Sequence, residues 1–524
     1  GKLAAALRSG RLALAVLLVI AAFMVGTRVV RHTVPPSFQR ITFQRGTVDA
    51  ARFAPDGQTI VYSAAWEGRR TEVFAARVES PGSRALGFGH AALFSVSGTG
   101  ELALSLRPYH FATTINPGTL AVASLAGGTA REMLENVEWA DWSPDGSRLA
   151  VVRVVGPKRR VELRPGGVLY ETTGGISHLR FSPDGRRIAF LDHPTPGDDR
   201  GAVAVVDLER KLNRLSDRWE ALEGLAWAAS GNEIWFTGAR KGASRQLYAV
   251  TLAGRTRLIA SLPGQLTLQD IHRDGRVLLL FDMFRSEVRG LRSTDSSECD
   301  LSWLDDTAPS DLSLDGRALL VTEQGEGGGA NYAVGLRAIG GSSVVKLGDG
   351  NGRALSPDGR WVLASLPSSP GRLLLYPTGA GEVRTLPGEG IENCFIARWF
   401  DDGRRIAFTA NQPGREARVF VQDVGTGAAR ALTPEGTGLG LAVSRDGRFV
   451  LSGLPGDSGA AVYPVDGSTA RPIPGVKRGE ALLSFTDDGL SIFVMDWLEM
   501  PSRIYRIEIA TGRRTLWKSI APPD

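Results

Sequence analysis

Cysteine and histidine are scarce in this chain of 524 residues, which has two of the first and six of the second. Two cysteines, Cys299 and Cys394, are too few for the disulfide framework of a small secreted domain. One bridge remains possible, but the two residues lie in different repeats, so we expect two unpaired thiols. No His-Glu-x-x-His and no Cys-x-x-Cys motif occurs, so we expect no metal ion and no cofactor.

Runs of like charge are also absent. The chain has 61 Lys and Arg against 56 Asp and Glu, a formal net charge of +5, and only seven of the 61 are lysines. No block of five or six like charges occurs, so the arginines are interpreted as solvated surface residues and no nucleic-acid partner is expected. With 43% hydrophobic and 22% charged residues, the composition is that of a folded globular protein.

Only one long apolar run occurs, Leu12–Thr27, which carries no charge and has basic residues on both sides. A spanning helix usually needs about 17–25 apolar residues, so this segment is short but workable if flanking arginines reach the headgroups. The alternative is a secretory signal peptide, but no A-x-A-like cleavage site follows. We therefore expect a single membrane anchor rather than a cleaved signal.

Helical periodicity is missing from the rest of the chain, where a Ser-Pro-Asp-Gly turn and its variants recur instead. Proline presets φ, aspartate tolerates the bridge region, and glycine accepts positive φ, so each copy predicts a tight chain reversal. Aligned on the glycine, the copies follow at intervals of 39–46 residues. The eleven turn glycines are Gly57, Gly100, Gly146, Gly185, Gly231, Gly275, Gly316, Gly359, Gly403, Gly447 and Gly489.

Each repeat holds four strand signals, which are clearest in residues 395–433, where "FIARW", "RRIAFTA", "ARVFVQDV" and "ARALT" follow one another. An aromatic residue ahead of several turns is expected to face a neighbouring repeat. These residues are Phe53, Trp142, Phe181, Trp227 and Trp399. Four antiparallel strands per repeat of this length predict an all-β fold of β-propeller blades, whereas a β-sandwich array would not explain so regular a period.

Eleven four-stranded blades exceed the four to eight of one ring, so two β-propellers in tandem are expected, with a break near Asp305–Asp311. The segment "QRITFQRG", Gln39–Gly46, is interpreted as a possible ring-closing strand. The predicted organisation is 1–11 basic juxtamembrane segment, 12–27 transmembrane helix, 28–45 linker and possible ring-closing strand, 46–305 first propeller of about six blades, and 306–521 second propeller of about five blades.

The "SPDG" turn followed by "RRIAF" and a "VVDL" strand resembles TolB-type propeller repeats over residues 40–521. "VEWADWSPDGSRLAVVR", "GEGGGANYAV" and "LSPDGRWVLA" are also similar to the extracytoplasmic part of bacterial eukaryote-like serine/threonine protein kinases. That resemblance implies one membrane helix joining the propellers to a cytoplasmic kinase domain upstream of Gly1. Winged-helix regulators with membrane-anchored TolB-like regions share this layout, so the upstream domain stays open.

Three short motifs suggest catalysis but lack their partners. "HRDG" at His272–Gly275 has no Asn five residues after Asp274 and no "DFG" anywhere, so it is interpreted as a blade turn and not a kinase loop. "GEGGG" at Gly325 is interpreted as a flexible hairpin, and "PGDSG" at Pro455 has no base or acid in a recognisable context. "GDDR" at Gly197 and "LDD" at Leu304 are expected to be solvated loops. No catalytic, cofactor-binding or metal-ligating residue is therefore predicted.

The expected function is a membrane-tethered sensor or protein-interaction module that is itself no enzyme. We expect a single-pass inner-membrane protein with its propellers on the periplasmic side, anchored by residues 12–27 and binding a protein, peptide or glycan of the envelope. The alternatives are a TolB-like propeller that assists envelope transport, the sensor part of a winged-helix regulator, and a hydrolase with a metal in the propeller channel.

Overall fold

The computed structural model describes residues 37–521 except 80–81, 109–116, 263, 283–285, 292–296, 342, 369, 389, 438–439, 458 and 498–499. The chain divides into two compact units, Gly1–Phe43 and Gln44–Asp524. The described residues form no α-helix, only the single 3-10 turns η1 (Glu326–Gly328) and η2 (Pro455–Asp457). The all-β prediction is thus confirmed, while the predicted helix over 12–27 lies outside the described residues. None of the described segments is a helix long and apolar enough to cross a membrane.

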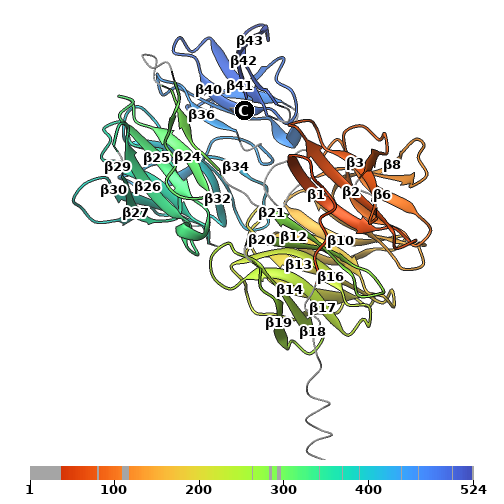
Figure 1. The fold of residues 1–524 in the computed structure, drawn as a ribbon. Helices are drawn as coiled ribbons and strands as arrows, with labels where there is room; N and C mark the ends of the chain where they lie inside the picture. Colours follow the sequence, from red (N-terminus) through yellow and green to blue (C-terminus); the bar gives the residue numbers. More distant parts are fainter. Residues whose placement is uncertain are drawn as a thin grey trace, which may run out of the picture. The chain divides into compact units, whose positions relative to one another are not determined.

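Strands β1 to β23 cover the first six repeats (Figure 1). They are β1 (Gly46–Phe53), β2 (Thr59–Trp66), β3 (Glu72–Arg77), β4 (Ser83–Ala85), β5 (Ala91–Val96), β6 (Glu101–Leu106), β7 (Gly118–Ser124), β8 (Arg131–Trp142), β9 (Leu149–Val155), β10 (Lys158–Arg164), β11 (Val168–Thr172), β12 (Gly175–Phe181), β13 (Arg187–His193), β14 (Ala202–Asp207), β15 (Leu212–Arg214), β16 (Ala221–Trp227), β17 (Glu233–Ala239), β18 (Gln246–Thr251), β19 (Thr256–Ala260), β20 (Gln265–Ile271), β21 (Val277–Asp282), β22 (Arg289–Gly290) and β23 (Cys299–Asp300). We call β1 to β21 the first group.

The last five repeats each form one four-stranded antiparallel sheet, and we call them the second group. Their strands are β24 (Thr307–Leu312), β25 (Ala318–Glu323), β26 (Ala333–Ala338), β27 (Val344–Asp349), β28 (Asn351–Leu355), β29 (Trp361–Leu366), β30 (Arg372–Pro377), β31 (Arg384–Thr385), β32 (Asn393–Trp399), β33 (Arg405–Asn411), β34 (Arg418–Asp423), β35 (Ala429–Ala431), β36 (Leu441–Val443), β37 (Phe449–Gly453), β38 (Ala460–Pro464), β39 (Arg471–Ile473), β40 (Ala481–Phe485), β41 (Ser491–Asp496), β42 (Ser502–Glu508) and β43 (Arg514–Ile520).

Four repeats of the first group do not form separate four-stranded sheets. The long strand β8 ends the second repeat and begins the third, so the two repeats share one seven-stranded sheet. The sixth repeat contributes only β20 and β21, which join the fifth repeat in a six-stranded sheet through one parallel bridge between Gly224 and Leu268. The short hairpin β22–β23 forms a sheet of its own. Beside that hairpin, Val288 and Leu301 pack with Leu319 and Val321 of β25, so it shares a hydrophobic cluster with the second group.

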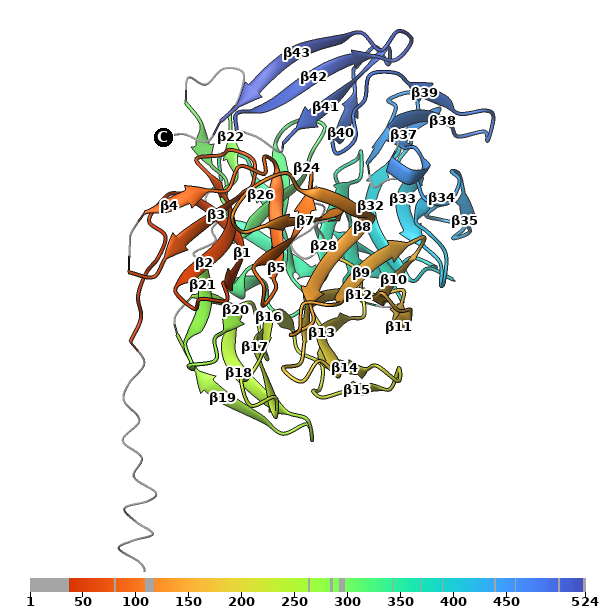
Figure 2. The same ribbon diagram turned by 90° about the vertical axis from the view of Figure 1, so that its right-hand side faces the viewer.

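The first strands of successive repeats lie side by side, and in the first group β1 returns to pack on β20 (Figure 2). The first group thus closes into a circle of contacts through strands that are more than two hundred residues apart. In the second group β24, β28, β32, β36 and β40 pack in sequence, without a comparable packing of β40 on β24 among the described strands. The predicted strand over Gln39–Gly46 is not formed, because β1 begins at Gly46 and residues 37–45 are irregular.

All eleven turn glycines adopt positive φ, between 63° at Gly57 and 90° at Gly275. In each turn the glycine N–H donates to the carbonyl oxygen three residues earlier, as from Gly185 to Ser182 at 2.9 Å. In the Ser-Pro-Asp-Gly copies the serine hydroxyl donates to the aspartate, as from Ser182 to Asp184 at 2.5 Å. The repeated motif is confirmed as a tight turn between the first and second strands.

The hydrophobic core lies between neighbouring sheets rather than inside any one of them. Leu191 and Val205 of the fourth repeat, for example, pack against Leu222 and Phe236 of the fifth. The five aromatic residues expected to face a neighbouring repeat do so: Phe53 contacts His272, and Trp142, Phe181, Trp227 and Trp399 pack in or against clusters shared with the preceding repeat. A single sheet would leave these apolar faces in water, so the repeats depend on their neighbours.

Replacing Gly359 with alanine is expected to lower the free energy of unfolding by about 1–2 kcal/mol, because a Cβ is disfavoured at positive φ. Its φ is 68° and an added Cβ would meet no atom within 4 Å, so backbone strain alone is tested. Gly379→Ala is the matched control, since a Cβ there also meets nothing and its φ lies outside the strained region. Urea denaturation compares the two variants, and equal losses of stability would contradict the assignment.

Candidate functional site: buried charges on the inner strands

Aspartates five positions before the turn glycine connect neighbouring sheets. The carboxylate accepts a hydrogen bond from the backbone N–H four positions before the turn glycine of the next sheet. We call these three residues the latch aspartates: Asp141 bonds Phe181 at 2.8 Å, Asp270 bonds Phe53 at 3.0 Å, and Asp311 bonds Leu355 at 2.8 Å. A carboxylate that accepts a backbone N–H is a strong, charge-assisted partner, so each latch fixes two sheets at their turn ends. Asp270 closes the first group because it joins the sixth repeat to the first.

Arginines at the equivalent position reach across the same boundaries. The Arg52 Nη1 atom donates to the Gln269 carbonyl oxygen at 3.1 Å. Arg180 donates to that same oxygen, and its Nη1 lies 3.5 Å from Oδ1 of Asp141. The side-chain oxygen of Gln269 accepts the Ala51 N–H at 3.1 Å. Charged groups from the first, third, fourth and sixth repeats therefore meet on the strands that precede the turns, β1, β8, β12 and β20, which with their equivalents in other repeats we call the inner strands.

Burial sets the electrostatics of this cluster. Removal from water, followed by the nearby charge of Arg180, lowers the pKa of Arg52 to about 9, so the guanidinium is still charged at neutral pH. Burial raises the pKa of Asp141, while Arg180 and the Phe181 N–H act in the opposite direction. Breaking a buried ion pair typically costs about 3–5 kcal/mol, because the remaining charge is left without a partner. The four charged side chains therefore depend on one another.

A chain of hydrogen bonds runs through two histidines of the fourth repeat. His193 Nδ1 lies 3.1 Å from the carbonyl oxygen of Arg200, which can only accept, so Nδ1 carries the proton. His193 Nε2 is then the acceptor for the Ser177 hydroxyl at 2.7 Å. The Nδ1 atom of His178 lies 3.0 Å from the same hydroxyl oxygen, and its ring contacts Trp139 at 4.4 Å between centroids. Burial lowers the pKa of both histidines, so they are neutral.

This serine and histidine have the hydrogen-bond arrangement of a nucleophile and its base. Ser177 is only 1% exposed and His193 only 2%. A nucleophile must approach its substrate to about 3 Å, which a sealed hydroxyl cannot do. The hydrogen bonds therefore serve to satisfy buried polar groups within the fold.

The prediction that "GDDR" forms a solvated loop is wrong. Asp198 is buried, and its two carboxylate oxygens accept hydrogen bonds from Arg200, at 2.8 Å from Nε and 2.6 Å from Nη2. Burial, with the charge of Asp198 adding to it, raises the pKa of Asp199 to about 7. Arg200 Nη1 also donates to the Asn331 side chain at 3.4 Å, which places the loop against the turn between β25 and β26. In "LDD", Leu304 and Asp305 are exposed as expected, whereas Asp306 is half-buried and burial raises its pKa.

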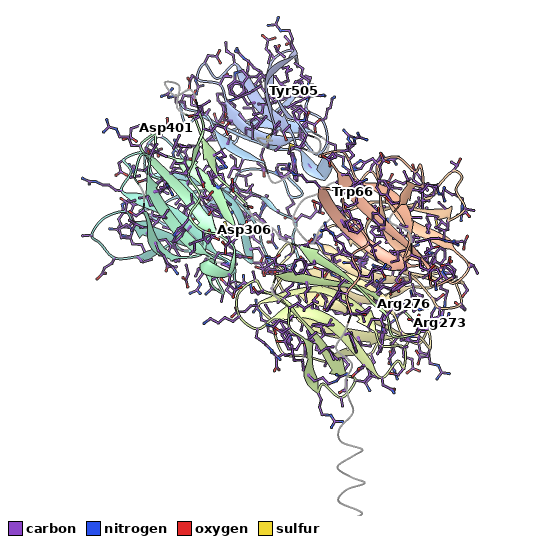
Figure 3. The ribbon with its side chains drawn as sticks, in the orientation of Figure 1. Trp66, Arg273, Arg276, Asp306, Asp401 and Tyr505 are labelled. Atoms are coloured by element: carbon purple, nitrogen blue, oxygen red, sulfur yellow. The ribbon has the colours of Figure 1, made fainter. Side chains whose placement is uncertain are left out.

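The "HRDG" segment is a blade turn, as the sequence indicates. Gly275 N–H donates to the His272 carbonyl oxygen at 3.0 Å, and Gly275 has a φ of 90°. Asp274 pairs with Arg276 at 2.8 Å, and Arg276 Nη2 donates to the Gly57 carbonyl oxygen at 2.5 Å, linking two adjacent turns. Figure 3 shows Arg273 and Arg276 at one side of the molecule, well away from Asp306.

The other singled-out motifs also lie in connections between strands. η1 contains Glu326 of "GEGGG", whose carboxylate accepts the N–H groups of Ala243 and Ser244 at 3.0 Å each. A cavity of about 230 Å³ lies beside this contact, lined by Ala243, Ser244, Gln265, Asp305, Asp306, Gly325 and Glu326. η2 follows β37 and contains the start of "PGDSG", whose Ser458 is outside the described residues. Cys299 and Cys394 are both free, as expected. No described group of three or more His, Cys, Asp or Glu side chains could hold a metal ion.

Known proteins resemble this chain only in structure. No family model and no curated protein matches it. Similar solved structures include the tricorn protease (14% identity, TM-score 0.33, 92% of this chain and 55% of that chain), TolB from Acinetobacter baumannii (16%, 0.28, 60% and 75%) and the GH74 enzyme of Niastella koreensis (10%, 0.32, 91% and 85%). The chain thus spans about half the length of the tricorn protease chain. The neighbours include TolB-type and other β-propeller proteins, but superpositions this loose carry no argument about activity.

Replacing Asp270 with alanine is expected to lower the free energy of unfolding by about 3 kcal/mol, because the Phe53 N–H loses its acceptor and the buried Arg52 loses a nearby opposite charge. Asp270→Asn should lose less, since an amide oxygen can still accept the Phe53 hydrogen bond. Asp401→Ala, at an exposed turn position, is the control. Urea denaturation measures the free energy of unfolding of the three variants. If D270A lost no more stability than D401A, the Asp270 latch would not stabilise the first group.

Stability should fall as pH rises from about 4 to about 7, in part because of Asp199. Its folded pKa of about 7 lies above the ordinary 3.8, so the folded chain holds a proton that the unfolded chain releases. Asp199→Asn removes this titration, and its Tm should exceed that of the parent by about 2 °C at pH 8 but by less at pH 5. Asp401→Asn is the control. A gain in Tm that is the same at both pH values would contradict the assignment.

Proposed function

We propose that this chain is a β-propeller protein-interaction module that works as a sensor on the outer side of a bacterial inner membrane. Its partner would be a protein, peptide or glycan of the envelope, held by the loops between strands. The observation that carries this is the set of latch hydrogen bonds at the inner strands. They fix neighbouring sheets to one another, and a rigid scaffold of sheets that presents variable loops is the usual arrangement of a binding protein.

A role without catalysis within this chain is part of the proposal. The Ser177–His193 pair has the right atoms for acyl transfer, but both side chains are sealed by the neighbouring strands. The "HRDG" triplet is occupied in turn contacts, since Asp274 pairs with Arg276 and with His272. These observations favour a binding role over an enzymatic one.

We also propose that the eleven repeats form two rings in tandem. The packing of β1 on β20 supports a closed first ring. The division near Asp305–Asp311 stays a prediction. The packing of Val288 and Leu301 on β25 is relevant to it, because that packing joins the β22–β23 hairpin to the second group.

Membrane tethering and linkage to a kinase are the finer part of the proposal. Tethering is supported by the uncharged run Leu12–Thr27 and its basic flanks. Linkage to a serine/threonine kinase is supported by the resemblance of the segments around Trp142 and Gly329. The coding sequence upstream of Gly1 decides between a kinase and a winged-helix regulator, and a TolB-like soluble propeller would require that residues 12–27 be absent from the mature protein.

The proposed topology predicts that Cys299, which is exposed, reacts with a membrane-impermeant maleimide in intact spheroplasts. Mass spectrometry of the full-length chain measures the labelling, with lysed cells as the reference for full access. In Leu18→Arg, a charge in the apolar run should weaken insertion by about 3 kcal/mol, so the labelled fraction in intact spheroplasts should fall. Labelling of the parent only after lysis would contradict the proposal.

A further inference from the structure

Two buried arginines of the first group, Arg180 and Arg245, form ion pairs with carboxylates. Arg180 pairs with Asp141 at 3.5 Å. Arg245 pairs with Glu223 at 2.9 Å. Asp141 lies on β8 and Arg180 on β12, whereas Glu223 lies on β16 and Arg245 directly before β18, so each of these two arginines is neutralised by a carboxylate from another element.

The second group lacks this balance at Arg353 and Arg398. Arg353 is the bulged residue of β28, where the register shifts between Gly352 and Ala354. Its Nε donates to the Ser365 hydroxyl at 2.8 Å. Arg398 on β32 donates through Nη1 to the Arg353 carbonyl oxygen at 2.9 Å. Neither guanidinium forms an ion pair with any carboxylate of the described residues. Asp311 is the carboxylate whose charge acts on Arg398, and no carboxylate is among the charges that act on Arg353.

Other charged and polar groups lie near this pair. Burial lowers the pKa of both arginines, and for Arg353 the like charge of Arg398 adds to the effect. Asp311 acts on Arg398 in the opposite direction, but its carboxylate already accepts the Leu355 N–H at 2.8 Å. Tyr332 and Cys394 lie near enough to influence Arg353. Burial raises the pKa of the Tyr332 phenol, which therefore keeps its proton and remains a possible hydrogen-bond donor.

We propose that Arg353 and Arg398 form a binding site for an oxyanion, either a carboxylate or a phosphate group, at the inner strands of the second group. The flat guanidinium fork matches the paired oxygens of both groups, which a lysine would not. A bound oxyanion would neutralise the unpaired charges and could accept a further hydrogen bond from the Tyr332 hydroxyl. The inference stands apart from the proposed sensor role, because it concerns only the chemistry of these side chains.

Cys394 provides a built-in reporter for this site. Burial raises the pKa of its thiol to about 12, whereas the Arg353 charge acts to lower it. An anion on Arg353 would cancel that charge, so the reactive thiolate becomes rarer and alkylation slows. Cys299 is exposed and lies outside this cluster, so it serves as an internal control in the same sample.

The experiment follows iodoacetamide modification of both cysteines by mass spectrometry in the purified full chain, with sodium phosphate or sodium acetate against sodium chloride at equal ionic strength. The expected result is at least a roughly threefold slowing at Cys394 by phosphate, acetate or both, with no change at Cys299. Which of the two salts acts at the lower concentration distinguishes a phosphate ligand from a carboxylate ligand.

Calorimetric titration with phosphate and with acetate is the second measurement, on the parent and three variants. Arg353→Gln and Arg398→Gln should each weaken binding of the effective anion by roughly tenfold, since one charge-assisted hydrogen bond or more is lost. Arg372→Gln, on an exposed arginine of β30, is the matched control and should bind as the parent does. Circular dichroism checks folding, and if one glutamine variant fails to fold, the other still decides. The proposal would be overturned if phosphate and acetate slowed the alkylation of Cys394 no more than chloride does. It would also be overturned if the folded glutamine variants bound the anion as tightly as the parent.

Discussion

The structure depends on hydrogen bonds that cross from one sheet to the next at the inner strands. A single four-stranded sheet cannot bury both of its faces, so its stability comes from its neighbours. The apolar clusters supply most of the burial, but they are not directional and do not fix which sheet ends meet. The latch aspartates add that direction, because each carboxylate must meet one backbone N–H of the next sheet. The same bond occurs at the closure of the first group and inside the second.

The turns determine local structure, whereas the latch hydrogen bonds join residues that are far apart in the sequence. The positive φ of the eleven glycines sets each reversal within a few residues and needs no partner sheet. The latch bond between Asp270 and Phe53 joins residues 217 positions apart, so it forms only when the first group closes. The two groups also differ in charge balance. Arg180 and Arg245 of the first group form ion pairs with carboxylates, whereas Arg353 and Arg398 form none with the described residues, and for this reason the proposed oxyanion site lies in the second group.

Much of the fold could be predicted from the sequence, because the turn chemistry is local. Proline, aspartate and glycine at fixed offsets defined the turns, and the aromatic residues ahead of them pointed to the neighbouring repeats. The latch aspartates directly precede an apolar residue ahead of three of the turns, in "ADW", "QDI" and "SDL", so a signal for them was present in the sequence. The burial of Asp198 and Asp199 was missed, because Arg200 and the Asn331 turn come from outside the loop. That Arg353 has no carboxylate partner could not be predicted from the sequence either. It depends on the bulge in β28 and on which side chains the neighbouring sheets place beside it.

The most direct test of the account is a double-mutant cycle on Arg52 and Asp270, the charged residues on either side of the closure of the first group. The unfolding free energies of the parent, Arg52→Ala, Asp270→Ala and the double variant give the coupling between the two side chains. If inter-sheet charges hold the first group closed, the coupling should be about 1–3 kcal/mol, and the double variant should lose less than the sum of the two single losses. Additive losses, with a coupling near zero, would contradict the account.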